Sequence, residues 1–324
     1  MEPSRSETPD VGRDPAGPTT RRLALRMART GLALAAIGFV TYALVTQWAQ
    51  VRASLQALSF GAVAVSLVAV LAALLASLMA WREIVGDLGS RLSVPHSAGV
   101  LFPGQLAKYV PGSLWSIVAA AELATRLGVP RARSAVAGLL FNILLPGVAL
   151  LLAVLALPAL LGAGGGWFLW LLVPAALAVV AALRPAVING GIRLLLRLVR
   201  RNPDGYELSR AGLLRALGWS VLSAVLLGGH MWVLVVGLGA PPGSALIPAI
   251  GGFLAAWVLG FVVVIAPAGV GVREYVLVLA LAPQLAGSAA SALTLAVVSR
   301  LLLTVADVAC AGAAAAMVAT RSRR

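Results

Sequence analysis

Apolar runs long enough to cross a lipid bilayer recur along almost the whole chain, and they constrain its fold more than any other feature. A helix rises ~1.5 Å per residue and the hydrocarbon layer is ~30 Å thick, so about 20 apolar residues span it. Hydrophobic residues make up 60% of the sequence and charged residues 11%, a balance that no soluble domain could bury. The sequence therefore predicts an all-α, polytopic integral membrane helix bundle. The apolar runs lie at 30–48, 58–80, 134–160, 167–183, 212–238, 245–265, 270–286 and 288–317.

The arginines between these runs predict how the chain is threaded through the membrane. Basic residues concentrate in loops on the cytoplasmic side. If segment 97–120 dips into the membrane and returns, twenty-one arginines share one side with the N-terminus, against Arg52 alone on the other. If 97–120 crossed instead, the loops at 121–134 and 184–215 would place ten arginines outside. We therefore expect about eight full crossings plus a re-entrant or broken helical hairpin at 97–120, with both termini on the cytoplasmic side of the membrane.

Outside the apolar runs, the domain organisation is simple. Residues 1–20 are rich in Pro, Gly, Ser, Thr and Asp and show no periodicity, which predicts a disordered cytoplasmic tail. Residues 21–318 are expected to form a single transmembrane domain that includes a basic cytoplasmic loop at 184–215. Residues 319–324 form a basic cytoplasmic C-terminus.

Within the loop at 184–215, basic and apolar residues recur at helical spacing. The pattern predicts a basic amphipathic helix on an anionic membrane surface, and a topology-fixing linker without lipid recognition is the alternative. The net charge of +14 is spread over such loops, so we expect contact with anionic lipid and no nucleic-acid binding. The arginines of the pattern are Arg193, Arg197 and Arg200, and the apolar residues opposite them are Leu194, Leu195, Leu198 and Val199.

The segment GQLAKYVPGSLW, residues 104–115, interrupts a helix within the apolar region. Pro111 removes a backbone hydrogen bond and costs ~3 kcal/mol or more in a helix interior, and Gly112 weakens the helix further. At membrane depth the freed backbone groups need partners from the protein or from a wet cavity. A broken helix here therefore predicts a buried or hydrated interior.

The chain's single lysine lies directly before this break. Ser113 could cap a helix that restarts at Leu114, and a helix N-terminus beside Lys108 and Tyr109 would favour an anion. The alternative is a proline kink with Lys108 extended to the cytoplasmic surface.

A second break follows in the segment APAGVGVREY, residues 266–275. Pro and Gly again separate apolar runs, and a helix is expected to restart near Val272 with Arg273 and Glu274 in its first turn. A cation at a helix N-terminus opposes the helix dipole. We therefore expect Arg273 to serve a partner, either an acidic side chain elsewhere or an anionic ligand, with Glu274 balancing part of its charge.

The last apolar run contains ionisable residues on one helical face. Arg300, Thr304 and Asp307 recur at i, i+4 and i+7. A charge near the bilayer centre costs ~2.5–3.5 kcal/mol on insertion scales, so such groups face a protein interior and have partners. Pairing with other helices and direct contact with a substrate are both open for Arg300 and Asp307.

No catalytic or metal-binding pattern is found in the sequence. There is no Ser-His-Asp order, no phosphate-binding glycine loop followed by Lys-Ser or Lys-Thr, and no zinc spacing. The single cysteine, Cys310, excludes an intramolecular disulfide, and the histidines His96 and His230 are too far apart to suggest a metal site. We expect His230 to be a hydrogen-bonded core residue, and we expect no enzyme activity, no metal and no cofactor.

Taken together, the two broken segments resemble the paired signatures of the lysylphosphatidylglycerol synthase transmembrane-region family. The resemblance covers roughly residues 30–318. Its best-known members form the membrane half of bacterial multiple-peptide-resistance factors, and that half is regarded as a lipid flippase. The chain offers no segment for a soluble aminoacyl-transferase domain, so a stand-alone member is expected. The resemblance matches Lys108, Pro111, Gly112 and Trp115 to the first motif, Gly269, Gly271, Arg273 and Glu274 to the second, and Arg300 and Asp307 to the last helix.

These features predict a flippase or related transporter that moves an anionic, phosphate-bearing lipid across the membrane. The alternatives are an integral membrane glycosyl- or acyl-transferase acting on a polyprenyl-linked lipid, with Glu122 or Glu274 as base, and a non-catalytic membrane partner of envelope-synthesis enzymes. The expected partners are membrane lipids with anionic headgroups, with a homo-oligomer or an envelope-synthesis enzyme as further options. The expected substrate-binding residues are Lys108, Tyr109, Pro111, Gly112, Ser113, Trp115, Gly269, Gly271, Arg273, Glu274, Arg300 and Asp307.

Overall fold

The computed structural model describes residues 56, 58–109, 115–161, 169–182, 184–198, 200, 202, 205–262 and 271–321. Within these ranges the chain forms helices joined by turns and contains no strand, as the sequence predicts. The predicted tail at 1–20 and the first apolar run at 30–48 lie outside the described residues.

Five of the described helices are long and apolar enough to cross a membrane. Each coincides with a predicted apolar run, and together they make the chain a multi-pass membrane protein. They are α3 (Phe60–Asp87), α6 (Arg131–Leu161), α9 (Arg210–Gly237), α10 (Pro242–Val262) and α12 (Ala289–Arg321).

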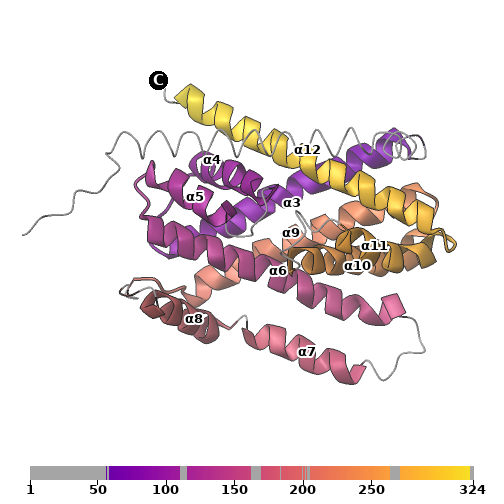
Figure 1. Cartoon of the computed structure of the whole chain (residues 1–324), viewed down its shortest axis with the longest axis horizontal. Coiled ribbons are helices and arrows are strands. Elements are labelled where there is room, and N and C mark those ends of the chain that lie inside the picture. The colour runs from indigo at the N-terminus through magenta and orange to yellow at the C-terminus, as the bar shows by residue number, and fades with distance from the viewer. Residues whose placement is uncertain are drawn as a thin grey trace, which may run out of the picture.

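The helices α3 and α9 each have sequence signals at both ends. Ser59 and Ser209 are the N-caps, and each hydroxyl accepts a hydrogen bond from the backbone N–H three residues later. Gly89 and Gly239, just beyond the helix ends, adopt φ values of +95° and +94°, which only glycine adopts readily. The two helices pack closely against each other (Figure 1).

Small residues on α10 bring the neighbouring helices close. Gly251 faces Ala156 on α6, and Gly252 faces Ala280 on α11 (Val272–Leu281) with no room for a Cβ. Small residues allow close helix approach in membrane proteins, where helices lack the hydrophobic effect of water to bring them together. These contacts place α11 between α10 and α12 (Figure 1).

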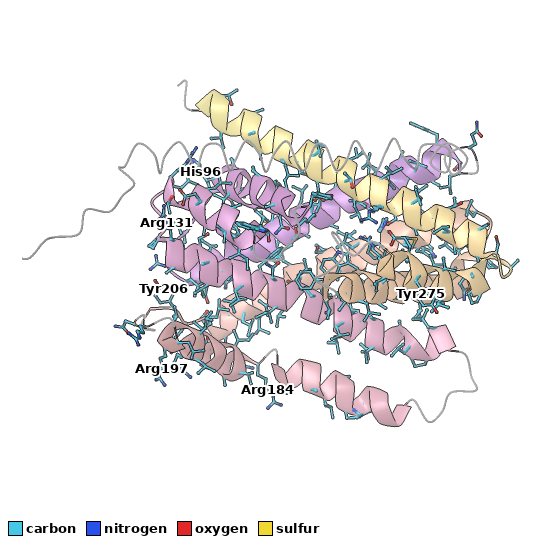
Figure 2. All side chains as sticks on the ribbon, in the orientation of Figure 1. His96, Arg131, Arg184, Arg197, Tyr206 and Tyr275 are labelled. Carbon is cyan, nitrogen blue, oxygen red and sulfur yellow. The ribbon has the colours of Figure 1, made fainter. Side chains whose placement is uncertain are left out.

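The predicted hairpin region contains two short helices, α4 (Val94–Gln105) and α5 (Trp115–Thr125), with the 3₁₀ turn η1 (Leu106–Tyr109) after α4. The two helices pack together, since Gly104 lies directly against Ala120. His96, near the start of α4, and Arg131, which follows α5, lie at the same end of the molecule (Figure 2). The chain thus enters and leaves this region at one end, as a hairpin does.

Two other predicted crossings correspond to shorter helices. Within the run at 167–183 the helix is α7 (Leu169–Ala182, 14 residues), and within 270–286 it is α11 (10 residues) followed by the 3₁₀ turn η4 (Ala282–Leu285). At ~1.5 Å per residue, a helix of 10 residues covers about half of the hydrocarbon layer. The number of eight full crossings stays a prediction.

The basic loop contains α8 (Pro185–Leu198), the strongly amphipathic helix that the sequence predicts. The face that α8 buries is not the apolar face that the sequence predicts. Ile188, Ile192 and Leu196 pack into the core, whereas the predicted apolar side is exposed at Leu194, Leu195 and Leu198. Arg200 lies beyond the helix and has a φ of +54°, so it does not extend the predicted arginine row. The sequence pattern failed because α8 has apolar residues on two sides, and one of them packs against the protein.

Candidate functional site

Charged side chains from three elements that are distant in sequence meet inside the bundle. We call this group the polar cluster. It is built by η1, by the first turn of α11 and by the middle of α12. Its members are Lys108, Tyr109, Arg273, Glu274, Arg300, Thr304 and Asp307.

Asp307 joins the end of η1 to α12. Its Oδ2 lies 2.6 Å from Nζ of Lys108 and accepts a hydrogen bond from the Tyr109 hydroxyl at 2.7 Å. The Asp307 side chain is 5% exposed, whereas that of Lys108 is 40% exposed. The predicted alternative, in which Lys108 extends to the surface at a kink, does not describe this geometry, because the ammonium points at a carboxylate on another helix.

Glu274 joins α11 to α12 and also caps α11. Its Oε2 accepts the backbone N–H of Gly271 at 2.6 Å, and its Oε1 lies 2.6 Å from Nη1 of Arg300. Gly271 has a φ of +88°, a backbone conformation that favours glycine, and this explains why a glycine precedes the helix. The predicted helix start near Val272 is confirmed.

Arg273 has an aromatic partner, whereas the sequence analysis expected either an acidic side chain or an anionic ligand. Its guanidinium lies over the ring of Phe253 on α10, with 4.8 Å between Cζ and the ring centroid. Phe253 is fully buried, and the edge of its ring meets His230 on α9 at a centroid distance of 4.5 Å. A cation over an aromatic face gains up to ~2 kcal/mol when desolvated, and the contact leaves the N–H groups of the guanidinium free to bond.

His230 is the hydrogen-bonded core residue that the sequence predicts. One ring nitrogen pairs with Ser299 Oγ at 2.8 Å and the other with the carbonyl oxygen of Leu227. Its backbone carbonyl in turn accepts a hydrogen bond from Ser66 on α3. The ring is therefore fixed, and it holds Phe253 in place beneath Arg273.

The cluster carries more positive than negative charge. Lys108, Arg273 and Arg300 face two carboxylates, and the ion pairs join Asp307 to Lys108 and Glu274 to Arg300. Nη2 of Arg273 and Nη2 of Arg300 are buried and have no hydrogen-bond partner among the described residues. Because an unsatisfied buried donor is costly, these two nitrogens require acceptor atoms beyond those of the described residues.

The structure brings together most of the predicted site residues. Lys108, Tyr109, Gly271, Arg273, Glu274, Arg300 and Asp307 form or adjoin the polar cluster. Trp115 begins α5 and is about half exposed. Pro111, Gly112, Ser113 and Gly269 lie outside the described residues.

Sequence reasoning missed Phe253 as a site residue. It lies within an apolar run, where an aromatic residue signals only burial. The two glycines before it were the available signal, since they indicate that other helices approach α10 at this level.

Comparison with known proteins connects this arrangement to a family. The family described as Lysylphosphatidylglycerol synthase TM region matches the chain over residues 28–311. No curated protein matches the sequence. The matched range includes every residue of the polar cluster.

Proposed function

The chain belongs to the lysylphosphatidylglycerol synthase transmembrane-region family, and we propose that it is a lipid flippase that moves an anionic, phosphate-bearing lipid across the membrane. The family supports a function that concerns membrane lipids. The observation that carries the finer proposal is the polar cluster, in which three cations surround two carboxylates and two buried guanidinium nitrogens have no partner among the described residues.

In this proposal, the phosphate of the lipid headgroup binds between Arg273 and Arg300. A guanidinium offers several N–H donors in a plane, which suits the oxygens of a phosphate. Arg273 is best placed to bind first, because Phe253 holds it without using its hydrogen bonds. Arg300 would then share its donors between Glu274 and the phosphate.

Asp307 and Glu274 keep the cluster close to neutral when no lipid is bound. A charge near the centre of a bilayer is costly unless it is paired. A counterion that the headgroup can displace also suits a transporter, since a headgroup that is held too tightly would not leave. We propose that the headgroup passes from Arg273 and Arg300 to Lys108 and Tyr109. There the lipid displaces Asp307, the counterion of Lys108.

The proposal also includes the membrane topology. The end of the molecule that carries Arg131 and Arg197 (Figure 2) would face the cytoplasm of a bacterium, because basic loops concentrate on that side. Segment 97–120 would then be the re-entrant hairpin that brings Lys108 into the membrane from the cytoplasmic side. Both termini would be cytoplasmic.

We propose transport in preference to catalysis. A transferase would need a free acidic base, and both candidates are engaged. Glu274 bonds with both of its oxygens, and Glu122 forms an ion pair with Arg131 at 2.9 Å. A role as a non-catalytic partner of envelope-synthesis enzymes has no observation in its favour beyond membership of the family.

The test is lipid movement in proteoliposomes that contain a fluorescent phosphatidylglycerol analogue. We expect wild-type protein to move the anionic analogue and Arg273→Ala to slow it at least ~tenfold, the loss expected when one charged hydrogen bond is removed. Arg126→Ala is the matched control, because Arg126 is an exposed arginine in the turn after α5 and away from the cluster. A phosphatidylcholine analogue reports whether the headgroup charge matters.

Two results would contradict the proposal. One is an Arg273→Ala protein that folds and moves phosphatidylglycerol at the wild-type rate. The other is equal movement of both analogues by the wild-type protein, because the arginines would then not distinguish an anionic headgroup from a zwitterionic one.

A further inference from the structure

A second group of charged residues lines a pocket at the basic end of the molecule, apart from the polar cluster. The pocket has a volume of about 310 Å³ and lies between the end of α3, the turn that follows it and the start of α9. Its charged lining consists of Arg82, Arg91, Arg215, Glu83 and Asp87, and Gly86 forms part of the wall. A pocket of ~300 Å³ is at the small end of the range for ligand sites, which suits a compact polar ligand.

The three arginines have hydrogen-bond donors to spare. Arg82 uses Nε to bond the carbonyl oxygen of Leu92 at 2.8 Å, and Arg215 uses Nε to bond Glu83 at 2.8 Å. These bonds occupy Nε of each guanidinium. The two outer nitrogens, Nη1 and Nη2, make no hydrogen bond among the described residues. Arg91 is exposed and has no bonding partner among the described residues. Its side chain passes over Gly86, where a Cβ would lie 3.7 Å from Cγ of Arg91.

The acidic residues of the pocket have structural partners. Asp87 accepts hydrogen bonds from the backbone N–H of Ser209 at 2.6 Å and from its hydroxyl at 2.8 Å, so it holds the N-cap of α9. Glu83 lies between Arg215 and Arg82, with 3.8 Å to Nη1 of Arg82. The carboxylates therefore position the arginines and the start of α9, and one positive charge remains in excess.

We propose that this pocket binds a phosphate group through Arg82, Arg91 and Arg215. Guanidinium groups bind phosphate oxygens in pairs of parallel hydrogen bonds, and three of them around one pocket can satisfy a tetrahedral anion. The phosphate comes either from the headgroup of a membrane phospholipid or from a small soluble phosphate compound. This inference does not depend on transport through the polar cluster, and it concerns different residues.

A purely structural role for these charges makes a different prediction. Arg215 and Glu83 tie α9 to α3, and that tie would account for both residues without any ligand. It would not account for Arg91, which bonds to nothing among the described residues and yet lies at the pocket. Arg91 is therefore the residue on which the two explanations differ, and its replacement should leave the fold intact.

The experiment measures binding to the purified full-length protein with three probes. Inorganic phosphate and glycerol 3-phosphate are titrated by calorimetry against the protein in a non-ionic detergent. Retained phosphatidylglycerol is counted by native mass spectrometry after release from nanodiscs of phosphatidylglycerol and phosphatidylcholine. Each probe is applied to the wild type, to Arg91→Ala and to the control Arg126→Ala. Both arginines are exposed, and they flank the hairpin, Arg91 before α4 and Arg126 after α5.

We expect Arg91→Ala to weaken binding of at least one probe ~tenfold, the size of one charged hydrogen bond, and Arg126→Ala to change it less than twofold. Binding of the two soluble probes assigns the pocket to a soluble phosphate compound, and retention of phosphatidylglycerol alone assigns it to a lipid headgroup. The proposal is overturned if no probe binds, or if Arg91→Ala and Arg126→Ala behave alike. A failure of lipid movement in the Arg273→Ala experiment would leave these outcomes unaffected, because the readout here is binding at Arg91.

Discussion

The polar cluster and the basic-end pocket use the same kinds of side chain in different surroundings. In the cluster, ion pairs are 2.6 Å long and Asp307 is 5% exposed. In the pocket, Arg215 pairs with Glu83 at 2.8 Å, but the arginine side chain is 55% exposed. Coulomb attraction at a given distance is several times stronger at low effective dielectric than in water, and the cost of removing one partner rises with it.

This difference indicates how each region can work. Two of the three cations in the cluster, Lys108 and Arg300, are each paired with a carboxylate, so a ligand must displace one of these carboxylates or use the unpartnered nitrogens of Arg273 and Arg300. In the pocket, Arg82 and Arg215 each use Nε for a hydrogen bond and Arg91 has no bond among the described residues, so an anion can bind the outer guanidinium nitrogens without breaking the pair between Arg215 and Glu83. The polar cluster therefore favours exchange of a carboxylate for a ligand, and the basic-end pocket favours binding of an anion without such exchange.

The largest expected effect comes from Asp307→Asn. The change keeps the shape of the side chain but leaves the Lys108 ammonium without its counterion and the Tyr109 hydroxyl without an anionic acceptor. We expect a loss of about 3 kcal/mol in the free energy of unfolding, the lower end for breaking a buried pair, because Lys108 is partly exposed. Reversible unfolding in detergent micelles measures it.

The double variant Lys108→Met with Asp307→Asn is the control for that experiment. Removing both charges avoids the unpaired ammonium, so a large part of the lost stability should return. If Asp307→Asn alone is as stable as the wild type, the pair does not stabilise the contact between η1 and α12, and the contrast between the two regions fails.

A second comparison uses one glycine from each region. Gly271 at the start of α11 and Gly89 after α3 have φ values of +88° and +95°. Alanine at either position should cost about 1–2 kcal/mol, because a Cβ disfavours this backbone conformation. Thermal unfolding should therefore shift similarly for the two variants.

The two glycine variants should differ in lipid movement. Gly271→Ala disturbs the backbone N–H that holds Glu274, and through it Arg300, whereas Gly89 lies against Arg133 and far along the chain from the cluster. We expect only Gly271→Ala to slow the phosphatidylglycerol analogue. Equal rates in both variants would show that the geometry of Glu274 does not matter for transport.

The sequence was sufficient to predict the parts of the fold that depend on local pattern. Five apolar runs became long helices because hydropathy alone makes a helix favourable in lipid. The start of α11 was also predictable. A glycine with a glutamate three positions later, here Gly271 and Glu274, is a local signal for a helix N-terminus. The residues that gather in the cluster were identified because ionisable groups are rare in apolar runs.

The pairing within the cluster could not be predicted from the sequence. Glu274 follows Arg273 directly, but neighbours in a helix point about 100° apart, so Glu274 pairs with Arg300 on α12 and Arg273 lies over Phe253. Asp307 and Lys108 are far apart in sequence and meet only because α4 packs on α12. Such choices depend on tertiary packing, and no local pattern encodes them.

The basic-end pocket was missed for a related reason. Arg82, Arg91 and Arg215 lie in different loops and helix ends, where arginines are expected for topology. Only the packing of α3 against α9 brings Arg215 beside Glu83. In the sequence, these arginines cannot be distinguished from others such as Arg126.

The smallest expected effect is that of Glu83→Gln in the pocket. The change removes the partly exposed ion pair with Arg215 and the longer one with Arg82, which should together cost about 0.5 kcal/mol at low salt. Raising the ionic strength to about 0.5 M shortens the screening length to a few ångströms, so the difference from the wild type should nearly vanish. The same salt should leave most of the Asp307→Asn effect in place, because Asp307 is shielded from solvent. A salt response of equal size in both variants would mean that water reaches both regions alike, and the polar cluster could not then hold its counterions as a desolvated headgroup site requires.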